Sequence, residues 1–173
     1  EICSEAHAAE HLYCVIGGAA RECTYQFDGR RRVVDLLLPG DFFGLTPHEV
    51  CEYTIESAAQ GTTMARYPRR RLEALAESDP RLAHQIRLLA FQTICRLQTQ
   101  VLVMGKTTAV EKVGAFLGMM ASRLSNDRSD EVVLPISRYD IADYLAISVE
   151  TVSRSLTELE RRGVIRSFGT RRW

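Results

Sequence analysis

The spacing of hydrophobic and polar residues changes character at Pro68. Before Pro68, short apolar runs alternate with turns that contain Gly, Pro and Asp, a pattern typical of short strands. After Pro68, apolar residues recur at intervals of three and four, which is typical of amphipathic helices. The pattern therefore predicts an α+β chain in which antiparallel strands come first and helices follow.

The first 67 residues read as strands and turns. Predicted strands cover 12–16, 20–27, 30–38 and 62–67, and a further element begins at Phe42. Asp28-Gly29 and Pro39-Gly40-Asp41 are strong turn signals between them. Short strands with Gly-rich turns indicate an antiparallel β-roll, which we assign to residues 1–72. Because the chain begins at Glu1 within such sequence, we expect an N-terminal segment to be missing.

A long helix is predicted over residues 81–105, where neither Pro nor Gly interrupts the chain until Gly105. One row of side chains on it has heptad-like spacing: Leu82, Ile86, Leu89, Thr93, Leu97, Gln100 and Met104. A second row consists of Leu88, Phe91, Cys95 and Leu102. Two rows require two partners, so we interpret the first as a dimerisation face and the second as the side that packs on the roll. The alternative is that both rows pack within one chain. With the dimer interpretation, we assign residues 73–105 to a hinge and dimerisation helix.

Three further helices are predicted in the segment 106–173, which we assign to a third domain. The first covers 106–124 and is followed by a polar loop at 125–131 and a short strand at 132–137. Ser137 with Asp140 resembles a capping box that begins a helix at Arg138. Ser148 is a good N-cap for another helix, residues 149–161, after a turn at Ile147.

The helix 149–161 has two contrasting sides. Val152, Leu156 and Leu159 fall within an arc of about 60°, and polar residues occupy the opposite side. A helix, a short turn and a second helix with a polar front are typical of a helix-turn-helix that enters the major groove of DNA. The alternative to DNA recognition is that this polar side simply faces water. A Glu150–Arg154 pair at this spacing is common on exposed helices, which it stabilises by only about 0.3 kcal/mol.

The sequence around this helix favours DNA binding over a solvated surface. Residues 136–173 hold seven arginines against five acidic residues, a local charge of +2 within a chain of net charge zero. The segment 161–172 also resembles a β-hairpin wing. We expect base edges to be read by Val149, Glu150, Ser153 and Arg154. We expect phosphates to be contacted by Ser137, Arg138, Ser148, Thr151, Thr157, Arg161 and Arg171.

Other classes of function find little support in the residues. No apolar run approaches the ~18 residues of a membrane span. The five cysteines include no CxxC pair, which fits reduced thiols in the cytoplasm better than a disulfide framework. His7 and His11 lack a third metal ligand. No nucleophile elbow, phosphate-binding loop or cupin metal motif is present, so we predict that the protein is not an enzyme.

The sequence resembles the CRP/FNR family of transcription regulators over nearly its whole length. The segment 29–45, GRRRVVDLLLPGDFFGL, resembles the family's cyclic-nucleotide-binding-type roll, and 137–165 resembles its winged helix-turn-helix. The pattern Glu150-x-x-Ser153-Arg154 is similar to that of the FNR/FixK branch. The resemblance implies a homodimer that reads a TTGAT-N4-ATCAA-type palindrome, interacts with RNA polymerase and serves low-oxygen or nitrogen-related gene control.

The departures from the family concern its ligands. Where a cyclic nucleotide would meet a Glu and an Arg-Ser pair, this sequence has Leu45 and Glu52-Tyr53. The cysteine that FNR places in the roll falls near Ala65, and no cysteines cluster as an iron–sulfur site requires. We therefore expect no cofactor and no metal. The alternative is an effector-dependent regulator whose roll binds an unidentified small ligand or haem.

Overall fold

The computed structural model describes residues 2–124 and 132–166 of the chain. These residues divide into two compact units, Glu1–Gln98 and Thr99–Trp173. The boundary between them lies within one long helix. The predicted α+β class, with a roll of antiparallel strands followed by helices, is confirmed.

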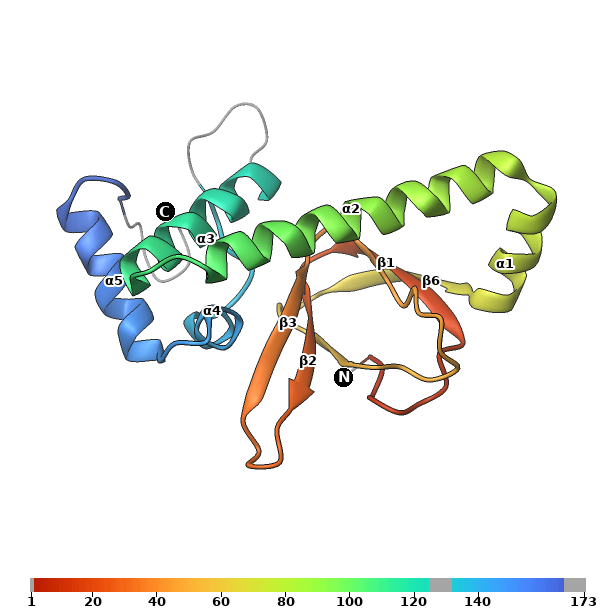
Figure 1. Ribbon diagram of the computed structural model, residues 1–173, viewed down its shortest axis with the longest axis horizontal. Helices are drawn as coiled ribbons and strands as arrows, with labels where there is room; N and C mark the ends of the chain where they lie inside the picture. The colour runs from red at the N-terminus through yellow and green to blue at the C-terminus, as the bar shows by residue number, and fades with distance from the viewer. Residues whose placement is uncertain (1, 125–131, 167–173) are drawn as a thin grey trace. The chain divides into compact units, whose positions relative to one another are not determined.

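Six strands form the first unit (Figure 1). They are β1 (His11–Gly17), β2 (Ala20–Tyr25), β3 (Arg31–Leu37), β4 (Phe42–Phe43), β5 (Thr54–Ser57) and β6 (Thr63–Pro68). One sheet has the order β4-β1-β6 and the other β3-β2-β5, and each strand pair is antiparallel. The strand β5 was not foreseen, because a segment of four residues is too short to show a hydrophobic period.

The core of the roll forms where alternate residues of the strands point inward. Its central side chains are Val15, Ala20, Leu37, Phe43 and Ile55, all at most 5% exposed. Both predicted turns are present. Gly29 and Gly40 have φ values of 80° and 92°, which non-glycine residues rarely adopt. The Asp41 side chain accepts a bond of 2.7 Å from the backbone N–H of Leu38 and so stabilises the second turn.

Two helices follow the strands, α1 (Arg69–Ser78) and α2 (Pro80–Met104). The Arg96 side chain of α2 lies within hydrogen-bond distance of two carboxylates from the roll. Its guanidinium donates to Asp35 at 2.7 Å and to Asp41 at 2.9 Å. The Asp35 side chain is only 2% exposed, so this contact is a buried ion pair that fixes α2 against β3 and the turn after it.

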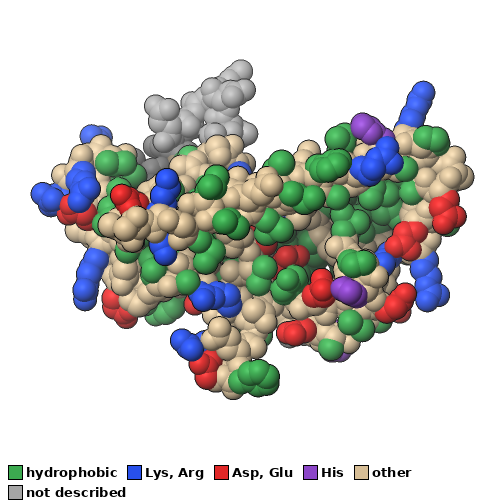
Figure 2. Space-filling model, viewed as in Figure 1, with side chains coloured by type: hydrophobic (Ala, Val, Ile, Leu, Met, Phe, Trp, Pro, Cys, Tyr) green, Lys and Arg blue, Asp and Glu red, His purple; other side chains and the backbone are tan. Residues whose placement is uncertain are grey.

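The two predicted rows on α2 differ in exposure. In the first predicted row, Leu82, Ile86, Leu89, Thr93 and Met104 are half-buried, Gln100 is buried and Leu97 is exposed within the single chain. The large apolar side chains that α2 leaves exposed are called the exposed row, and Leu97 belongs to both rows: Leu88, Phe91, Ile94, Leu97, Val101 and Leu102. Figure 2 shows hydrophobic side chains along the surface over α2. Within the single chain, most of the first predicted row is therefore more buried than the exposed row, and the assignment of either row to a dimer stays a prediction.

The second unit contains α3 (Ala109–Leu124), α4 (Arg138–Leu145) and α5 (Val149–Arg161). The strand expected at 132–137 is wrong, since only Val133 lies in a single bridge. Pro135 cannot donate to a strand ladder, which limits pairing there. The polar loop predicted at 125–131 lies outside the described residues, as does most of the predicted wing.

Neither a membrane-crossing helix nor a metal site emerges in the part of the chain that the structure describes. No helix there is long and apolar enough to span a bilayer. No group of three or more His, Cys, Asp or Glu side chains there could hold a metal ion.

Candidate nucleic-acid interface

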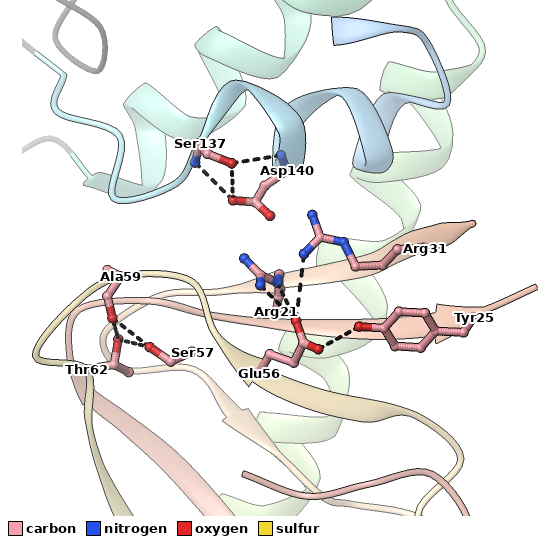
Figure 3. Close-up of polar contacts among 9 residues, drawn as sticks. All are labelled: Arg21, Tyr25, Arg31, Glu56, Ser57, Ala59, Thr62, Ser137 and Asp140. Carbon is pink, nitrogen blue, oxygen red and sulfur yellow. Dashed lines mark hydrogen bonds and ion pairs between the residues drawn. The ribbon is translucent and has the colours of Figure 1, made fainter. Parts of the chain in front are cut away.

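Side-chain caps fix the starts of both α4 and α5. Ser137 and Asp140 form the expected capping box: the Ser137 hydroxyl accepts from the Asp140 N–H at 3.2 Å, and Asp140 accepts from the Ser137 N–H at 3.0 Å (Figure 3). The Ser148 hydroxyl accepts from the Thr151 N–H at 3.1 Å. Both caps satisfy helix N–H groups that would otherwise lack partners, so they set where each helix begins.

The apolar side of α5 anchors it to its neighbours. Val152, Leu156 and Leu159 are at most 6% exposed, as predicted, and α5 packs on α3 and α4. Because these residues lie on one side, the opposite side of α5 turns outward. Within the second unit, the arrangement is a helix, a tight turn and a second helix that is held rigidly by its back.

The four predicted base-reading residues lie together on the first two turns of α5. Glu150 and Arg154 are exposed, and Val149 and Ser153 are half-buried. Hydrogen bonds from its own backbone N–H and from Ser148, together with the charge of Arg154, lower the pKa of Glu150. The carboxylate is therefore ionised at neutral pH and can only accept hydrogen bonds.

The residues predicted to contact phosphate form a less uniform group. Ser137 and Arg138 begin α4, while Ser148 and Thr151 begin α5. The Thr157 hydroxyl donates to the Ser153 carbonyl at 3.1 Å, so its proton is already used within the helix. Arg171 lies outside the described residues.

Arg161 is engaged within its own helix. Its side chain donates to Glu158 at 2.8 Å, and Arg162 donates to the same carboxylate at 2.6 Å. These two arginines lower the pKa of Glu158 to about 2. The acid is therefore ionised at neutral pH and accepts hydrogen bonds from both guanidinium groups.

We expect Glu158→Gln to strengthen binding to DNA of any sequence. The neutral amide holds the two arginines less strongly, so both become available to phosphate. The dependence of log K on log salt should then steepen, by up to about 1 for one added phosphate contact. Titrations at several salt concentrations measure this slope, and Glu160→Gln supplies the control on the same helix. An unchanged slope would mean that Arg161 and Arg162 lie away from the DNA.

The C-terminus of α4 contains a strained residue that the sequence did not reveal. Ala146 caps the helix with φ 58° and ψ 42°, a left-handed conformation that usually calls for Gly or Asn. We expect Ala146→Gly to raise the free energy of unfolding of the second unit by about 0.5–1 kcal/mol, since the strain removed exceeds the entropy added to the unfolded chain. Thermal unfolding followed by circular dichroism tests this, with Ala142→Gly inside α4 as a control that should destabilise. A lower midpoint for Ala146→Gly would contradict it.

A cavity of about 320 Å³ lies in the first unit, between the roll and α2. Its walls are largely apolar. They include Leu45, Glu52 and Tyr53, the positions at which the sequence departs from the family's cyclic-nucleotide pattern. Burial raises the pKa of Glu22, another lining residue, to about 7, with Asp35 adding to the effect. Arg96 also lines the cavity, but its guanidinium is already bonded to Asp35 and Asp41.

A capped pair of helices with a compact polar front on the second defines the class of protein: a helix-turn-helix DNA-binding protein. Two protein-family models match the sequence, one within each unit. Residues 111–173 match a Crp-like helix-turn-helix domain, and residues 1–79 match a cyclic nucleotide-binding domain.

Similarity to known proteins identifies a family within this class. The chain is 39% identical to the nitrogen fixation regulation protein FixK of Azorhizobium caulinodans, over 99% of this chain and 70% of that protein. It is 35% identical to the transcriptional activatory protein AadR of Rhodopseudomonas palustris, over 94% of this chain and 68% of AadR. The structure of FixK2 from Bradyrhizobium japonicum superposes with a TM-score of 0.91 at 34% identity, covering 99% of this chain and 85% of FixK2.

The chain belongs to the CRP/FNR family of transcription regulators, in its FNR/FixK-like branch. The resemblance seen in the sequence is thereby confirmed.

Proposed function

We propose that the protein is a homodimeric, FixK-like transcription regulator that reads a TTGAT-N4-ATCAA-type palindrome without cyclic nucleotide or an iron–sulfur cluster. The observation that supports this most is the exposed pair of Glu150 and Arg154 at the start of a capped helix whose back is buried. We further propose three functional segments: a roll at 1–72, a hinge and dimerisation helix at 73–105, and a DNA-binding domain at 106–173.

Base recognition follows from the chemistry of these side chains. A guanidinium can donate two parallel bonds to O6 and N7 of guanine, and a carboxylate can accept from N4 of cytosine. Glu150 and Arg154 are one helical turn apart, which suits neighbouring base pairs. Both side chains are exposed, and the charge of Arg154 helps to keep the Glu150 carboxylate ionised by lowering its pKa.

The exposed row on α2 supports a dimer. Six large exposed apolar side chains on a 25-residue helix form a surface that a monomer would not normally leave open to water. A second copy of the same helix is the partner that we propose for this row. Two-fold symmetry in the protein then matches a palindromic operator with two half-sites.

The cavity supports independence from cyclic nucleotide. A cyclic phosphate needs a cationic partner, yet Arg96 is the one Lys or Arg among the described lining residues and is already paired with two carboxylates. Glu22 and Glu52 would add repulsion whenever they are ionised. The donor set in this cavity does not suit a cyclic nucleotide.

The biological role that we propose draws on the relatives. FixK proteins are named for regulation of nitrogen fixation, and AadR is named an activatory protein. We propose that this protein likewise activates transcription, by recruiting RNA polymerase at promoters tied to low oxygen or nitrogen. None of these relatives is named as an enzyme.

The second candidate is an effector-dependent regulator, and the cavity is the observation that favours it. A space of about 320 Å³ with mainly apolar walls is large enough for a small ligand. The two candidates differ in whether purified protein, without additions, binds the operator specifically.

Arg154→Ala tests the proposed reading directly. We expect a loss of about 1–3 kcal/mol on the specific site and a weaker preference at one base pair per half-site. Arg161→Ala is the comparison, because loss of a phosphate contact lowers affinity for all sequences alike. Fluorescence anisotropy on the palindrome and on a scrambled duplex measures both. Equal losses on the two duplexes for Arg154→Ala would assign it to the phosphate backbone instead.

A further inference from the structure

The side chain of Arg138 spans the gap between the two helices of the DNA-binding motif. Arg138 is the first residue of α4, and its Nη1 donates to the Ser153 hydroxyl oxygen on α5 at 3.4 Å. The capping box of Ser137 and Asp140 fixes the backbone on which Arg138 stands (Figure 3). Arg138 therefore contacts Ser153, a proposed base-reading residue, from a backbone position that the capping box holds in place.

This contact limits what the Ser153 hydroxyl can do. A serine hydroxyl has one proton to donate and two lone pairs that accept. Arg138 occupies a lone pair, because a guanidinium can only donate. Within the described part of the chain, no partner takes the Ser153 proton. The hydroxyl keeps its proton and one lone pair. Because the hydrogen bond comes from a cation, it strengthens the hydroxyl as a donor and weakens the remaining lone pair as an acceptor.

The guanidinium itself is incompletely satisfied. The Arg138 Nε–H is buried and has no hydrogen-bond partner among the described residues. Buried polar groups without partners are uncommon and are retained mainly where a site depends on them. The Arg138 side chain contacts α5 although its Nε–H lacks a partner. This indicates that Arg138 positions Ser153, in addition to offering a positive charge to phosphate.

We propose that Arg138 is the positioning residue for Ser153 and holds its hydroxyl as a hydrogen-bond donor toward the DNA, so that Ser153 selects a base edge carrying an acceptor. Purine N7, guanine O6 and thymine O4 are such acceptors, whereas cytosine presents the N4 donor. Cytosine is then the base least accepted at the position that Ser153 faces. This inference rests on the proposed DNA-binding function.

The test compares Arg138→Lys, Ser153→Ala and the double variant. Lysine keeps the positive charge for phosphate, but it is shorter and lacks the planar fork, so it does not span a contact that is already 3.4 Å long. Each protein is titrated with the operator and with duplexes that carry every base, placed symmetrically, at each half-site position. Salt titrations on a scrambled duplex count phosphate contacts, and thermal unfolding checks the fold.

We expect Arg138→Lys and Ser153→Ala to lose discrimination against cytosine at the same base pair, each by about fivefold, as for one hydrogen bond. The double variant should lose no more than either single variant. Arg138→Lys should keep the wild-type salt slope and unfolding midpoint.

Two results would overturn the proposal: a base-preference profile unchanged by Arg138→Lys, or losses that multiply in the double variant. Either would leave Arg138 as a phosphate contact alone. Wild-type protein without any sequence preference would instead contradict the proposed function, and the two failures are thereby distinguishable.

Discussion

Val101→Glu is expected to convert the protein into monomers and to weaken operator binding by ~100-fold or more. Val101 is 69% exposed in the single chain, so the substitution disturbs no packing within it. In a dimer formed through the exposed row, the same residue from both copies would approach the two-fold axis. Two carboxylates would then lose water and repel one another, which costs several kcal/mol.

The loss of DNA affinity follows from the loss of the second half-site. Two linked reading heads bind a palindrome 10²–10⁴ times more tightly than one, in general terms. Sedimentation velocity measures the oligomeric state, and anisotropy measures the affinity. Gln92→Glu, also exposed on α2, adds the same charge outside the exposed row and should remain dimeric. A Val101→Glu protein that sediments like the wild type would rule out this face as the interface.

Arg96→Met is expected to lower the free energy of unfolding of the first unit by about 3–5 kcal/mol, the usual cost of breaking a buried ion pair on one side. Asp35 is 1% exposed and would lose its guanidinium partner in a place that disfavours a lone charge. Burial by itself would lower the pKa of Arg96, but Asp35 and Asp41 outweigh that effect and raise it. The arginine is therefore charged throughout the accessible pH range.

Urea unfolding of the variant measures the cost. Arg87→Met is the matched control, since Arg87 is exposed on the same helix and removes an equal charge. Adding Asp35→Asn to Arg96→Met should recover part of the loss, because the amide carries no charge and can still accept from the Leu36 N–H. Equal midpoints for Arg96→Met and Arg87→Met would show that the pair contributes nothing.

Local signals in the sequence predicted the DNA-binding motif well. Ser137, Asp140 and Ser148 act on N–H groups within three residues of themselves, so their cap roles follow from spacing alone. The buried side of α5 could be predicted for the same reason, because a single helical period determines it. The strained Ala146 left no such signal, since alanine is common in helices and carries no mark of a left-handed conformation.

Long-range relations could not be predicted in this way. Asp35 and Arg96 are 61 positions apart, and nothing local links a carboxylate in a strand to an arginine in a later helix. Periodicity showed two apolar rows on α2 but could not show which one the chain itself would cover. Gln100 is buried and Phe91 is exposed in the single chain, the opposite of what their polarity would predict.

We propose that this chain binds a FixK-type palindrome without a ligand. The most direct test is fluorescence anisotropy with untreated protein, in air and at physiological salt, on a TTGAT-N4-ATCAA duplex and a scrambled duplex of equal length. We expect binding to the palindrome at least ~10³-fold tighter than to the scrambled duplex, as for specific regulators in general. Equal and weak binding to both duplexes would contradict the account.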